Sequence, residues 1–303
     1  MKIVAVVVTY FPTHSQIENL IRSIEKQVNQ IVVVDNTPVY QIHWKSILKK
    51  ISFSKHVTLI FLNKNIGIAA AQNIGIKSAF KSKASRIVFF DQDSNPDLGM
   101  ISNMLAAERE LINRGISVGF LGPLLKNKSS DKYISIIKRF YFLLWRFNPS
   151  QNCSNFIEAE YVPSSGSMIK IITLKKIGLM KESFFIDWVD IEICIRAARF
   201  GFKHFVVNSA MMNHFIGDSS LRITRDIYLH NDIRNYYIVR NASNLLISEG
   251  IPFYWKINII FKLPFYVIIY SLTSKSKNKF IVFRKLIQSI YQGLMGNLGQ
   301  IYA

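Results

Sequence analysis

Two aspartates, Asp91 and Asp93, follow the apolar run 87–90 and are separated only by Gln92. The run predicts a strand buried on both faces, as in a parallel sheet covered by helices. Because strand side chains alternate, we expect both carboxylates on one side of the strand's carboxyl end, where open α/β sheets bind ligands. Paired carboxylates there suit a hard divalent cation that meets substrate phosphates. The composition of residues 91–97 is also typical of a turn.

Polar residues follow the upstream strands as well. The predicted strands cover residues 3–8, 30–34 and 57–62, and the predicted helices cover residues 15–27, 40–53 and 68–82. Three successive strand, loop and helix units predict a doubly wound, mostly parallel α/β sheet. Right-handed crossovers then bring the polar strand ends to one edge of this sheet, and those ends are Thr9, Asp35, Asn65 and Asp91.

Such an edge can bind a nucleoside diphosphate, because an acid can hold a ribose or base edge while a carboxylate pair holds a metal. The sequence contains neither G-x-G-x-x-G nor G-x-x-x-x-G-K-[ST], so neither a Rossmann dinucleotide site nor a P-loop is supported. Phosphates bound at this edge would be held by a metal and by side chains. Taken singly, each of these polar residues is also a common loop or cap residue.

A second acidic stretch leads into a helix predicted over residues 188–201. Asp187 is expected as its N-cap and Asp190 at the third helical position, where acids stabilise a helix. Asp190 is the better candidate for a general base, because Glu192 projects to another side with Arg196 as its i+4 partner. Asp187 and Glu192 stay open as alternatives.

Further candidate residues lie in the second half of the chain. The small-residue turn 164–167, which precedes a strand predicted at 168–172, allows a ligand to approach the backbone closely. His214 can add a neutral imidazole to a metal site made by carboxylates. Arginine forks suit pyrophosphate oxygens, although a solvated helix face explains such residues equally well, and the arginines concerned are Arg222, Arg225, Arg234 and Arg240.

The composition predicts an anionic partner. The 303 residues include 38 Lys and Arg against 19 Asp and Glu, so the formal net charge is +19. Half of the residues are hydrophobic, and the mean hydropathy is +0.18. This combination suits a membrane interface better than a disordered nucleic-acid-binding tail. The two cysteines give no disulfide framework, and the amino terminus reads as a strand without a signal segment. We therefore expect a cytoplasmic protein.

Residues 251–270 are almost wholly apolar or aromatic, but Lys256, Lys262 and Pro264 interrupt them. Because a membrane span needs ~20 mainly apolar residues, this segment is a poor span, and an interfacial segment on an anionic leaflet fits better. A buried helical hairpin stays open as an alternative. Residues 132–147 mix bases with aromatics, which favours contact with an acceptor or lipid head groups, or a partly buried element with snorkelling bases.

Five stretches, in this order, resemble the family 2 inverting glycosyltransferases of GT-A fold, and among them the bacterial rhamnosyltransferases of O-antigen and capsule synthesis. They are Val-Val-Val-Thr-Tyr at 6–10, Val-Val-Val-Asp-Asn at 32–36, Asn-Ile-Gly-Ile-Ala-Ala-Ala-Gln-Asn-Ile-Gly at 65–75, Phe-Phe-Asp-Gln-Asp at 89–93 and Ile-Asp-Trp-Val-Asp-Ile-Glu at 186–192. The resemblance extends over residues 2–241.

The resemblance implies a GT-A catalytic domain at residues 1–222, with its nucleotide-binding half at about 1–125 and its acceptor half at about 126–222. Residues 223–303 then form a C-terminal helical, membrane-associating extension. The resemblance implies that the nucleotide sugar is bound by Thr9, Tyr10, Asp35, Asn65, Gly67, Asn73, Asp91 and Gln92, and that the metal is bound by Asp93, Asp91 and His214. It places Gly166, Ser167, Asp187 and Trp188 on the acceptor side. Asp190 is the residue implied to deprotonate the acceptor hydroxyl. Many relatives have Glu-Asp where this chain has Val189-Asp190, so the acid before the expected base is absent.

The implied activity is transfer of L-rhamnose from dTDP-β-L-rhamnose, with inversion and with Mg²⁺ or Mn²⁺, to a lipid-linked oligosaccharide on a polyprenyl pyrophosphate. The enzyme would attach peripherally to the anionic inner leaflet of the cytoplasmic membrane. A UDP-hexose or UDP-N-acetylhexosamine donor is the main alternative. A sugar-phosphate nucleotidyltransferase would need a glycine- and arginine-rich loop after the first strand, which residues 9–12 do not supply. A nucleic-acid-binding protein would also account for the charge, but no readout motif is present and no nucleic-acid partner is expected.

Overall fold

The computed structural model describes residues 1–38, 56–127, 132–150, 154–214, 219–222, 226–229 and 232–301, and of residues 214, 219–222 and 226–229 it describes the backbone alone. The helix expected at 40–53 and the candidate Arg225 lie outside the described residues. So do the side chains of Arg222 and His214, of which only the backbone is placed.

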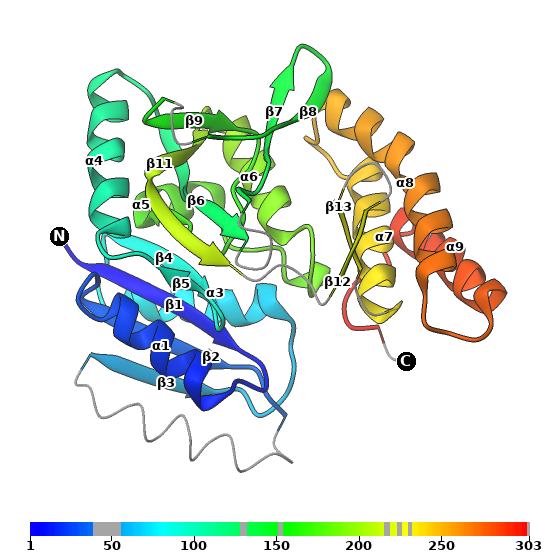
Figure 1. Cartoon of the computed structure of the whole chain (residues 1–303), viewed down its shortest axis with the longest axis horizontal. Coiled ribbons are helices and arrows are strands. Elements are labelled where there is room, and N and C mark those ends of the chain that lie inside the picture. The colour runs from blue at the N-terminus through cyan, green and yellow to red at the C-terminus, as the bar shows by residue number, and fades with distance from the viewer. Residues whose placement is uncertain are drawn as a thin grey trace.

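Among the described residues, the main sheet has nine strands in the order β3-β2-β1-β4-β10-β6-β11-β5, with β9 paired to β11 (Figure 1). The strands are β1 (Ile3–Thr9), β2 (Gln30–Asp35), β3 (Val57–Phe61), β4 (Arg86–Asp91), β5 (Asn95–Pro96), β6 (Val118–Asn127), β9 (Phe156–Ala159), β10 (Met168–Lys170) and β11 (Lys203–His214). Strands β1 to β4 are mutually parallel, and β10 inserts antiparallel between β4 and β6. The predicted mostly parallel, doubly wound sheet is confirmed.

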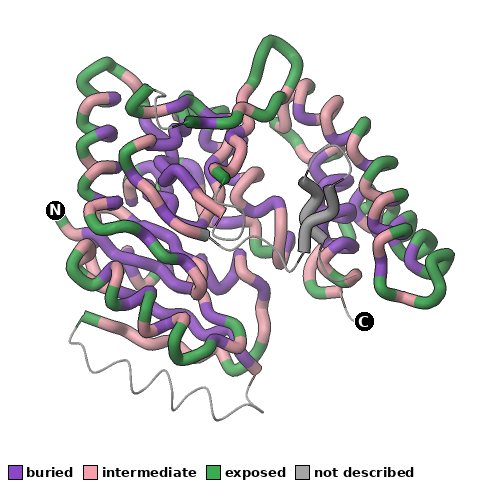
Figure 2. The backbone as a smooth tube through the Cα atoms, viewed as in Figure 1, coloured by how far each residue is buried: buried purple, intermediate pink, exposed green. Residues whose placement is uncertain are grey.

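Strand alternation divides the interior into two apolar layers. Val4 and Val6 of β1 face one layer, which is covered by α3 (Ile68–Lys81), α5 (Ile171–Ile177) and α6 (Val189–Arg199). Ile3, Ala5 and Val7 face the other, which is covered by α1 (His14–Ile24) and α4 (Met100–Asn113). Strands β1, β2 and β4 are buried on both faces, as Figure 2 shows in purple, and this is why they read as continuous apolar runs.

The C-terminal helices continue the first layer. They are α7 (Asp232–Ile247), α8 (Phe253–Thr273) and α9 (Lys279–Leu294), and they pack pairwise on one another. Val239 of α7 and Trp255 of α8 belong to the same buried cluster as Phe184 and Ile193, so this region shares a core with the helix that carries Asp190. The hairpin of β7 (Ile136–Phe140) and β8 (Leu143–Phe147) projects beside the start of α8 (Figure 1).

The structure corrects one predicted element and describes the form of the apolar segment. The strand expected at 168–172 ends at Lys170, and the following residues form the short helix α5. The segment 251–270 forms α8, which with α9 makes the helical hairpin that was left open, but it is buried on one face only. Within the described residues, α8 alone has the length and composition of a membrane-crossing helix, and 28% of its most apolar window is buried.

The close packing of α3 on β1 gives a stability prediction. An ideal Cβ on Gly75 of α3 would lie 2.3 Å from Cγ1 of buried Val6. Alanine favours a helix over glycine, yet we expect Gly75→Ala to lower the free energy of unfolding by about 1–3 kcal/mol because the core is overpacked. Chemical denaturation measures this change. Lys77→Ala, on the exposed side of the same helix, is the control and should stay within about 0.5 kcal/mol; a stabilised Gly75→Ala variant would contradict the packing argument.

Candidate functional site

The polar strand ends meet at one edge of the sheet, as expected. Parallel register pairs Thr9 of β1 with Asp35 of β2 and places Asp91 of β4 beside Val8. Thr9 donates its hydroxyl hydrogen to Asp35 over 2.9 Å, and Thr37 donates to the same carboxylate oxygen over 2.8 Å. Because Thr9 and Asp35 are buried, this carboxylate is fixed in orientation at the edge rather than exposed in a loop.

Three hydrogen bonds connect this edge to the loops that follow β1, β3 and β4. The amide of Tyr10 donates to Oε1 of Gln92 over 2.8 Å, which joins the loop after β1 to the loop after β4. Asn65 accepts from Nδ2 of Asn36 over 2.9 Å and from the amide of Gly67 over 3.0 Å. The predicted nucleotide-sugar residues Thr9, Tyr10, Asp35, Asn65, Asp91 and Gln92 therefore border one edge.

Gly67 marks a close approach between the donor side and the loop before α6. Its φ is +86°, and an ideal Cβ there would lie 2.6 Å from the carbonyl oxygen of Phe185. That same oxygen accepts from the amide of Ile68 over 2.7 Å. A side chain at position 67 would be strained by its backbone angle and would push this loop away, so glycine is required here.

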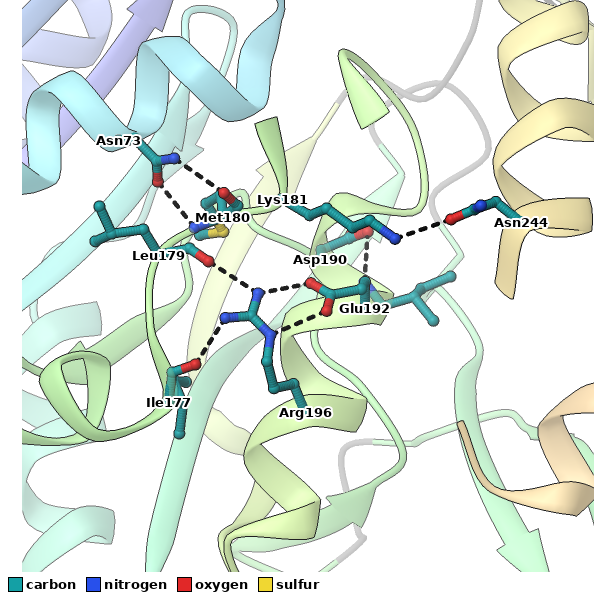
Figure 3. A network of polar contacts seen from close by, with 10 residues as sticks. Asn73, Ile177, Leu179, Met180, Lys181, Asp190, Glu192, Arg196 and Asn244 are labelled. Carbon is teal, nitrogen blue, oxygen red and sulfur yellow. Dashed lines mark hydrogen bonds and ion pairs between the residues drawn. The ribbon is translucent and has the colours of Figure 1, made fainter. Parts of the chain in front are cut away.

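Asn73 connects the same two regions from inside (Figure 3). Its amide nitrogen donates to the carbonyl of Met180 and to Glu182, each over 2.9 Å, and its oxygen accepts from the amide of Met180 over 2.8 Å. The side chain is buried and its polar atoms are engaged by the protein. Any contribution to the donor pocket, as implied by the resemblance, is made by holding the loop at 180–182.

Asp91 and Asp93 do not share one strand face, contrary to the expectation from strand alternation. Strand β4 ends at Asp91, and residues 91–94 form a turn in which Ser94 donates its amide to the Asp91 carbonyl over 3.1 Å. The turn that the composition of residues 91–97 favours is therefore present, and the strand does not continue to Asp93. The hydroxyl of Ser94 lies 2.7 Å from that of Ser165, which ties this turn to the 164–167 turn.

Gly166 and Ser167 support the strand that carries Asp91. The amide of Gly166 donates to the carbonyl of Phe89 over 2.7 Å, and the amide of Phe89 donates to the carbonyl of Ser167 over 2.9 Å. Ser167 is fully buried. Both residues lie beside β4, directly before its antiparallel neighbour β10, and neither lines the cavity described below.

The structure describes only part of the candidate metal site, because the side chain of His214 lies outside the described residues. Asp91 and Asp93 lie at the end of β4, and within the described part of the chain no hydrogen bond or ion pair engages the Asp93 carboxylate. Oxygen ligands of this kind suit Mg²⁺ or Mn²⁺. No three acidic, histidine or cysteine side chains cluster for a metal among the described residues, and the side chain of His214, at the end of β11, is not one of them.

Three acids lie in or just before helix α6, and their environments differ: Asp187 precedes the helix, and Asp190 and Glu192 are in its first turn. Glu192 forms a fork with Arg196, with distances of 2.9 and 2.7 Å, and the same guanidinium donates to the carbonyls of Ile177 and Leu179 (Figure 3). The expected i+4 pair is confirmed. Because this ion pair occupies Glu192, that residue is a poor alternative to Asp190 as a base.

Asp187 does not cap α6 as expected. The cap position is occupied by Trp188, whose φ is 64°, and no side chain caps the helix, so Asp190 is its second residue. The Asp187 carboxylate instead binds Arg234 of α7 with distances of 2.9 and 3.0 Å. This bidentate ion pair removes Asp187 as an alternative base and brings the C-terminal helices into the site.

The loop before α6 is conformationally strained and is held by α7. Three of its non-glycine residues have positive φ: Phe185 at 64°, Asp187 at 61° and Trp188 at 64°. Each costs on the order of 1–3 kcal/mol unless the surroundings impose it. Nδ2 of the fully buried Asn241 donates to the carbonyls of Phe184 and Ile186 over 2.9 Å and to that of Asp187 over 3.2 Å. The Phe185 ring stacks on Tyr237 of the same helix at 5.1 Å.

Arg234 and Asn241 therefore belong to the candidate site. The sequence suggested a different role for Arg234, and it did not point to Asn241. Arg234 had been considered for pyrophosphate or a solvated face, and it holds Asp187. Arg240 is neither solvated nor available for a ligand, since it is buried and donates to the carbonyl of Gly299 over 2.8 Å. Asn241 ends the stretch covered by the resemblance, but nothing in its local sequence indicates three carbonyl partners from another part of the chain.

Asp190 has the properties of a general base. Its carboxylate accepts the amide hydrogen of Ile191 over 2.9 Å. Burial raises its pKa to about 6, the charges of Asp187 and Asp91 add to the rise, and the hydrogen bond from Ile191 opposes it. A carboxylate with a pKa of about 6 is ionised near neutral pH and holds a proton more strongly than an ordinary aspartate.

Asp190 opens onto a cavity of about 270 Å³ between α6, the β7–β8 hairpin and the C-terminal helices. Its walls carry aromatic rings, acids and two bases. The lining residues are Ile137, Leu144, Arg146, Tyr161, Asp187, Trp188, Asp190, Ile191, Ile238, Trp255, Lys262, Tyr266 and Tyr270. The charge of Asp91, at the end of β4, adds to the rise in the pKa of Asp190, which lines this cavity.

The pKa of Asp190 gives a pH prediction. We expect kcat/KM to fall as the pH is lowered through about 6, because protonation removes the base. Asp190→Asn should bind donor normally and lose at least 100-fold in kcat. Since the folded-state pKa is raised, ionisation of Asp190 destabilises the fold above that pH, so the variant should be at least as stable at pH 8. Initial rates, nucleotide binding and thermal melts measure these effects; undiminished turnover would remove Asp190 from this role.

The clamp, by which we mean the hydrogen bonds from Asn241 to the carbonyls of Phe184, Ile186 and Asp187, gives a second prediction for this site. Asn241→Ala removes the amide that three carbonyls of the loop share, so we expect the free energy of unfolding to fall by about 1–3 kcal/mol and kcat to fall at least tenfold. The affinity for nucleotide should change less than kcat, because the loop positions the base. Ser248→Ala, near the end of the same helix, is the control. Wild-type kcat in a destabilised Asn241→Ala would show that the clamp does not position Asp190.

Comparison with known proteins agrees with this geometry. Residues 5–157 match the family described as glycosyl transferase family 2. The chain is also 32% identical to the dTDP-rhamnosyl transferase RfbF of Shigella flexneri over 301 residues, which cover 98% of this chain and 97% of that protein.

Solved structures of low sequence identity share the fold. The S. aureus TarS 1-349 structure with UDP-GlcNAc has a TM-score of 0.60 at 16% identity and covers 97% of this chain and 82% of its own. The GalNAc-T7 structure with UDP, GalNAc and Mn²⁺ has a TM-score of 0.57 at 12% identity, and the match covers 97% of this chain and 56% of that chain, just over half of its length. The α/β fold of GT-A type expected from the resemblance is confirmed.

Proposed function

Since the chain belongs to glycosyl transferase family 2 and is a hexosyltransferase, we propose that it transfers L-rhamnose from dTDP-β-L-rhamnose, with inversion, to a lipid-linked glycan during synthesis of bacterial O-antigen or capsule. The donor assignment rests on the RfbF relative, whose likeness extends over nearly the full length of both chains. The observation that carries the mechanism is the half-buried Asp190, which lines the cavity and whose pKa burial raises to about 6.

The arrangement favours a single displacement. The nucleotide sugar lies along the edge formed by Thr9, Asp35 and Asp91, and the acceptor hydroxyl enters the cavity. Asp190 takes the hydroxyl proton as the acceptor oxygen forms a bond to C1 and the bond from C1 to the dTDP oxygen breaks. Because attack and departure occur on opposite sides of C1, a β-linked donor gives an α-rhamnoside.

A divalent cation fits the end of β4. Asp91 and Asp93 supply hard oxygen ligands, the Asp93 carboxylate has no partner within the described residues, and His214 ends the β-strand that pairs with β5. Bound there, Mg²⁺ or Mn²⁺ would neutralise charge on the leaving nucleoside diphosphate. The Mn²⁺ that accompanies UDP in the GalNAc-T7 structure supports a cation in this fold.

The composition and exposure of the C-terminal helices support attachment to the inner leaflet of the cytoplasmic membrane. Residues 251–303 contain seven Lys or Arg and no Asp or Glu. The outward side of α8 exposes large apolar residues, among them Phe261 at 78% and Leu272 at 66%, and α9 exposes Phe280 at 73%. Figure 2 shows this exposed outer side in green. An apolar face surrounded by bases suits an anionic lipid surface, where the lipid carrier of the acceptor resides.

A panel of donors tests the proposed function. We expect dTDP-rhamnose to be turned over at least tenfold faster than UDP-glucose, UDP-galactose or UDP-N-acetylglucosamine, and EDTA to abolish the reaction until Mg²⁺ or Mn²⁺ is restored. Asp93→Ala should lose metal-dependent donor binding, whereas Asp97→Ala, an exposed acid after the turn, should keep it. Nucleotide release measures turnover. Preference for a UDP-sugar would overturn the donor assignment, and equal donor affinity in EDTA would overturn the metal assignment.

A further inference from the structure

The cavity at Asp190 has two basic residues on facing elements. Arg146 comes from strand β8 and Lys262 from helix α8, and both line the cavity. Tyr161 and Tyr266 line the same cavity, and the charge of Arg146 opposes the rise in the pKa of each tyrosine that burial causes. The reaction at C1 of the donor does not use either base, because the donor lies at the sheet edge.

The two walls are held together independently of these bases. Glu160, after β9, accepts from the Tyr254 hydroxyl over 2.8 Å and from the Trp255 indole over 3.3 Å, and it pairs with Arg139 of β7 at 3.2 Å. Helix α8 and the hairpin are thus fixed to one acid. These contacts of Glu160 involve neither Arg146 nor Lys262, and two bases that line one cavity suit an anionic ligand.

The size of the cavity limits the ligand. At about 270 Å³ it lies slightly below the range of ~300–1,000 Å³ typical of sites for drug-sized ligands. The enclosed space has room for one sugar ring with a small attached group. Since Asp190 lines the same cavity, the ligand's anionic group can be no more than about one sugar unit from the hydroxyl that reacts.

We propose that this cavity binds the acceptor as a single sugar joined directly to the diphosphate of its lipid carrier, with Arg146 and Lys262 holding the diphosphate and Asp190 facing the sugar hydroxyl. Trp188 and Trp255 supply apolar ring surface for the sugar, and the arginine fork and the lysine ammonium match diphosphate oxygens. This inference rests on the proposed function and narrows its acceptor.

The lipid part of the acceptor has a matching surface next to the cavity. The hairpin exposes Tyr141 at 78%, Phe142 at 70% and Leu143 at 67%, directly before the lining residues of β8. On α8, Phe261 and Phe265 flank the lining residue Lys262 and are also exposed. A diphosphate bound by Arg146 and Lys262 therefore has exposed apolar side chains close by, where its hydrocarbon chain can remain in the lipid.

The inference also places the enzyme in a reaction sequence. A monosaccharide on a lipid diphosphate is made when a sugar 1-phosphate is transferred from a nucleotide sugar to a polyprenyl phosphate, with release of a nucleoside monophosphate. This class of reaction must supply the acceptor. The product is a disaccharide on the same carrier, which is too long to bind again with its new terminal sugar at Asp190 and its diphosphate at the two bases.

The test is calorimetric titration of geranyl pyrophosphate into the full-length protein saturated with dTDP and Mg²⁺, so that the donor site is occupied. We expect one equivalent to bind, and Arg146→Gln and Lys262→Gln each to weaken its affinity at least tenfold. The matched controls are Lys138→Gln on the same hairpin and Lys256→Gln on the same helix, neither of which lines the cavity; both should stay within twofold. Geranyl monophosphate should bind more weakly than the pyrophosphate.

Two results would overturn the inference: no binding of geranyl pyrophosphate to the dTDP-saturated protein, or equal binding by the wild type and the two cavity variants. Sedimentation with vesicles of phosphatidylglycerol and phosphatidylethanolamine separates acceptor diphosphate from lipid head groups. Arg146→Gln and Lys262→Gln should sediment like the wild type. Loss of vesicle binding with unchanged pyrophosphate affinity would assign both bases to the membrane and reject the proposal. Failure of the donor assignment is distinguishable, since it appears in the donor panel while pyrophosphate binding persists.

Discussion

The amide side chain of Asn241 holds together the parts of this molecule that must act at once. Its single nitrogen donates to three carbonyls in the loop that precedes α6, at distances of 2.9, 2.9 and 3.2 Å. That loop has positive φ at three non-glycine residues, a conformation that the chain does not adopt without external support. The support comes from α7, about 50 residues further on. Hence the C-terminal helices form part of the candidate site.

The same loop connects the regions proposed for the two substrates. Its Phe185 carbonyl accepts from the first amide of α3, next to Gly67 at the sheet edge proposed for the donor, while Asp187 and Trp188 line the cavity proposed for the acceptor. A displacement of the loop would therefore disturb both. A rigid connection is useful in a displacement reaction, because the attacking oxygen, C1 and the leaving oxygen must lie in line within a fraction of an ångström.

Electrostatics distinguishes the acids of this region. Asp187 is ion-paired with Arg234, and Glu192 with Arg196. Asp190 is left in a half-buried position where its pKa rises to about 6. A family member with an acid directly before the base would have one more negative charge here, and Val189 replaces it with a buried apolar side chain. The chain thus achieves a moderately basic carboxylate by burial and by the nearby charges of Asp187 and Asp91.

The sequence by itself determined the architecture and the donor edge. Buried parallel strands are continuous apolar runs, and the loops that follow them are polar, so the sheet and the positions of Thr9, Asp35 and Asp91 could be predicted from local patterns. The i+4 pairing of Glu192 with Arg196 is local in the same sense. Asp93 shows the limit of this reasoning, because the strand ended two residues earlier in a turn of equally suitable composition.

Only the tertiary structure decided which side chains meet across long separations. Arg234 reaches Asp187, Asn241 reaches the loop before α6, and Arg240 is buried against Gly299, although each looks in sequence like an ordinary polar residue of a helix. The face that α8 buries and the face that it exposes are both apolar, so periodicity could not separate them. Helical and strand patterns report the environment of one element, whereas these contacts depend on how α7 and α8 pack against the sheet domain.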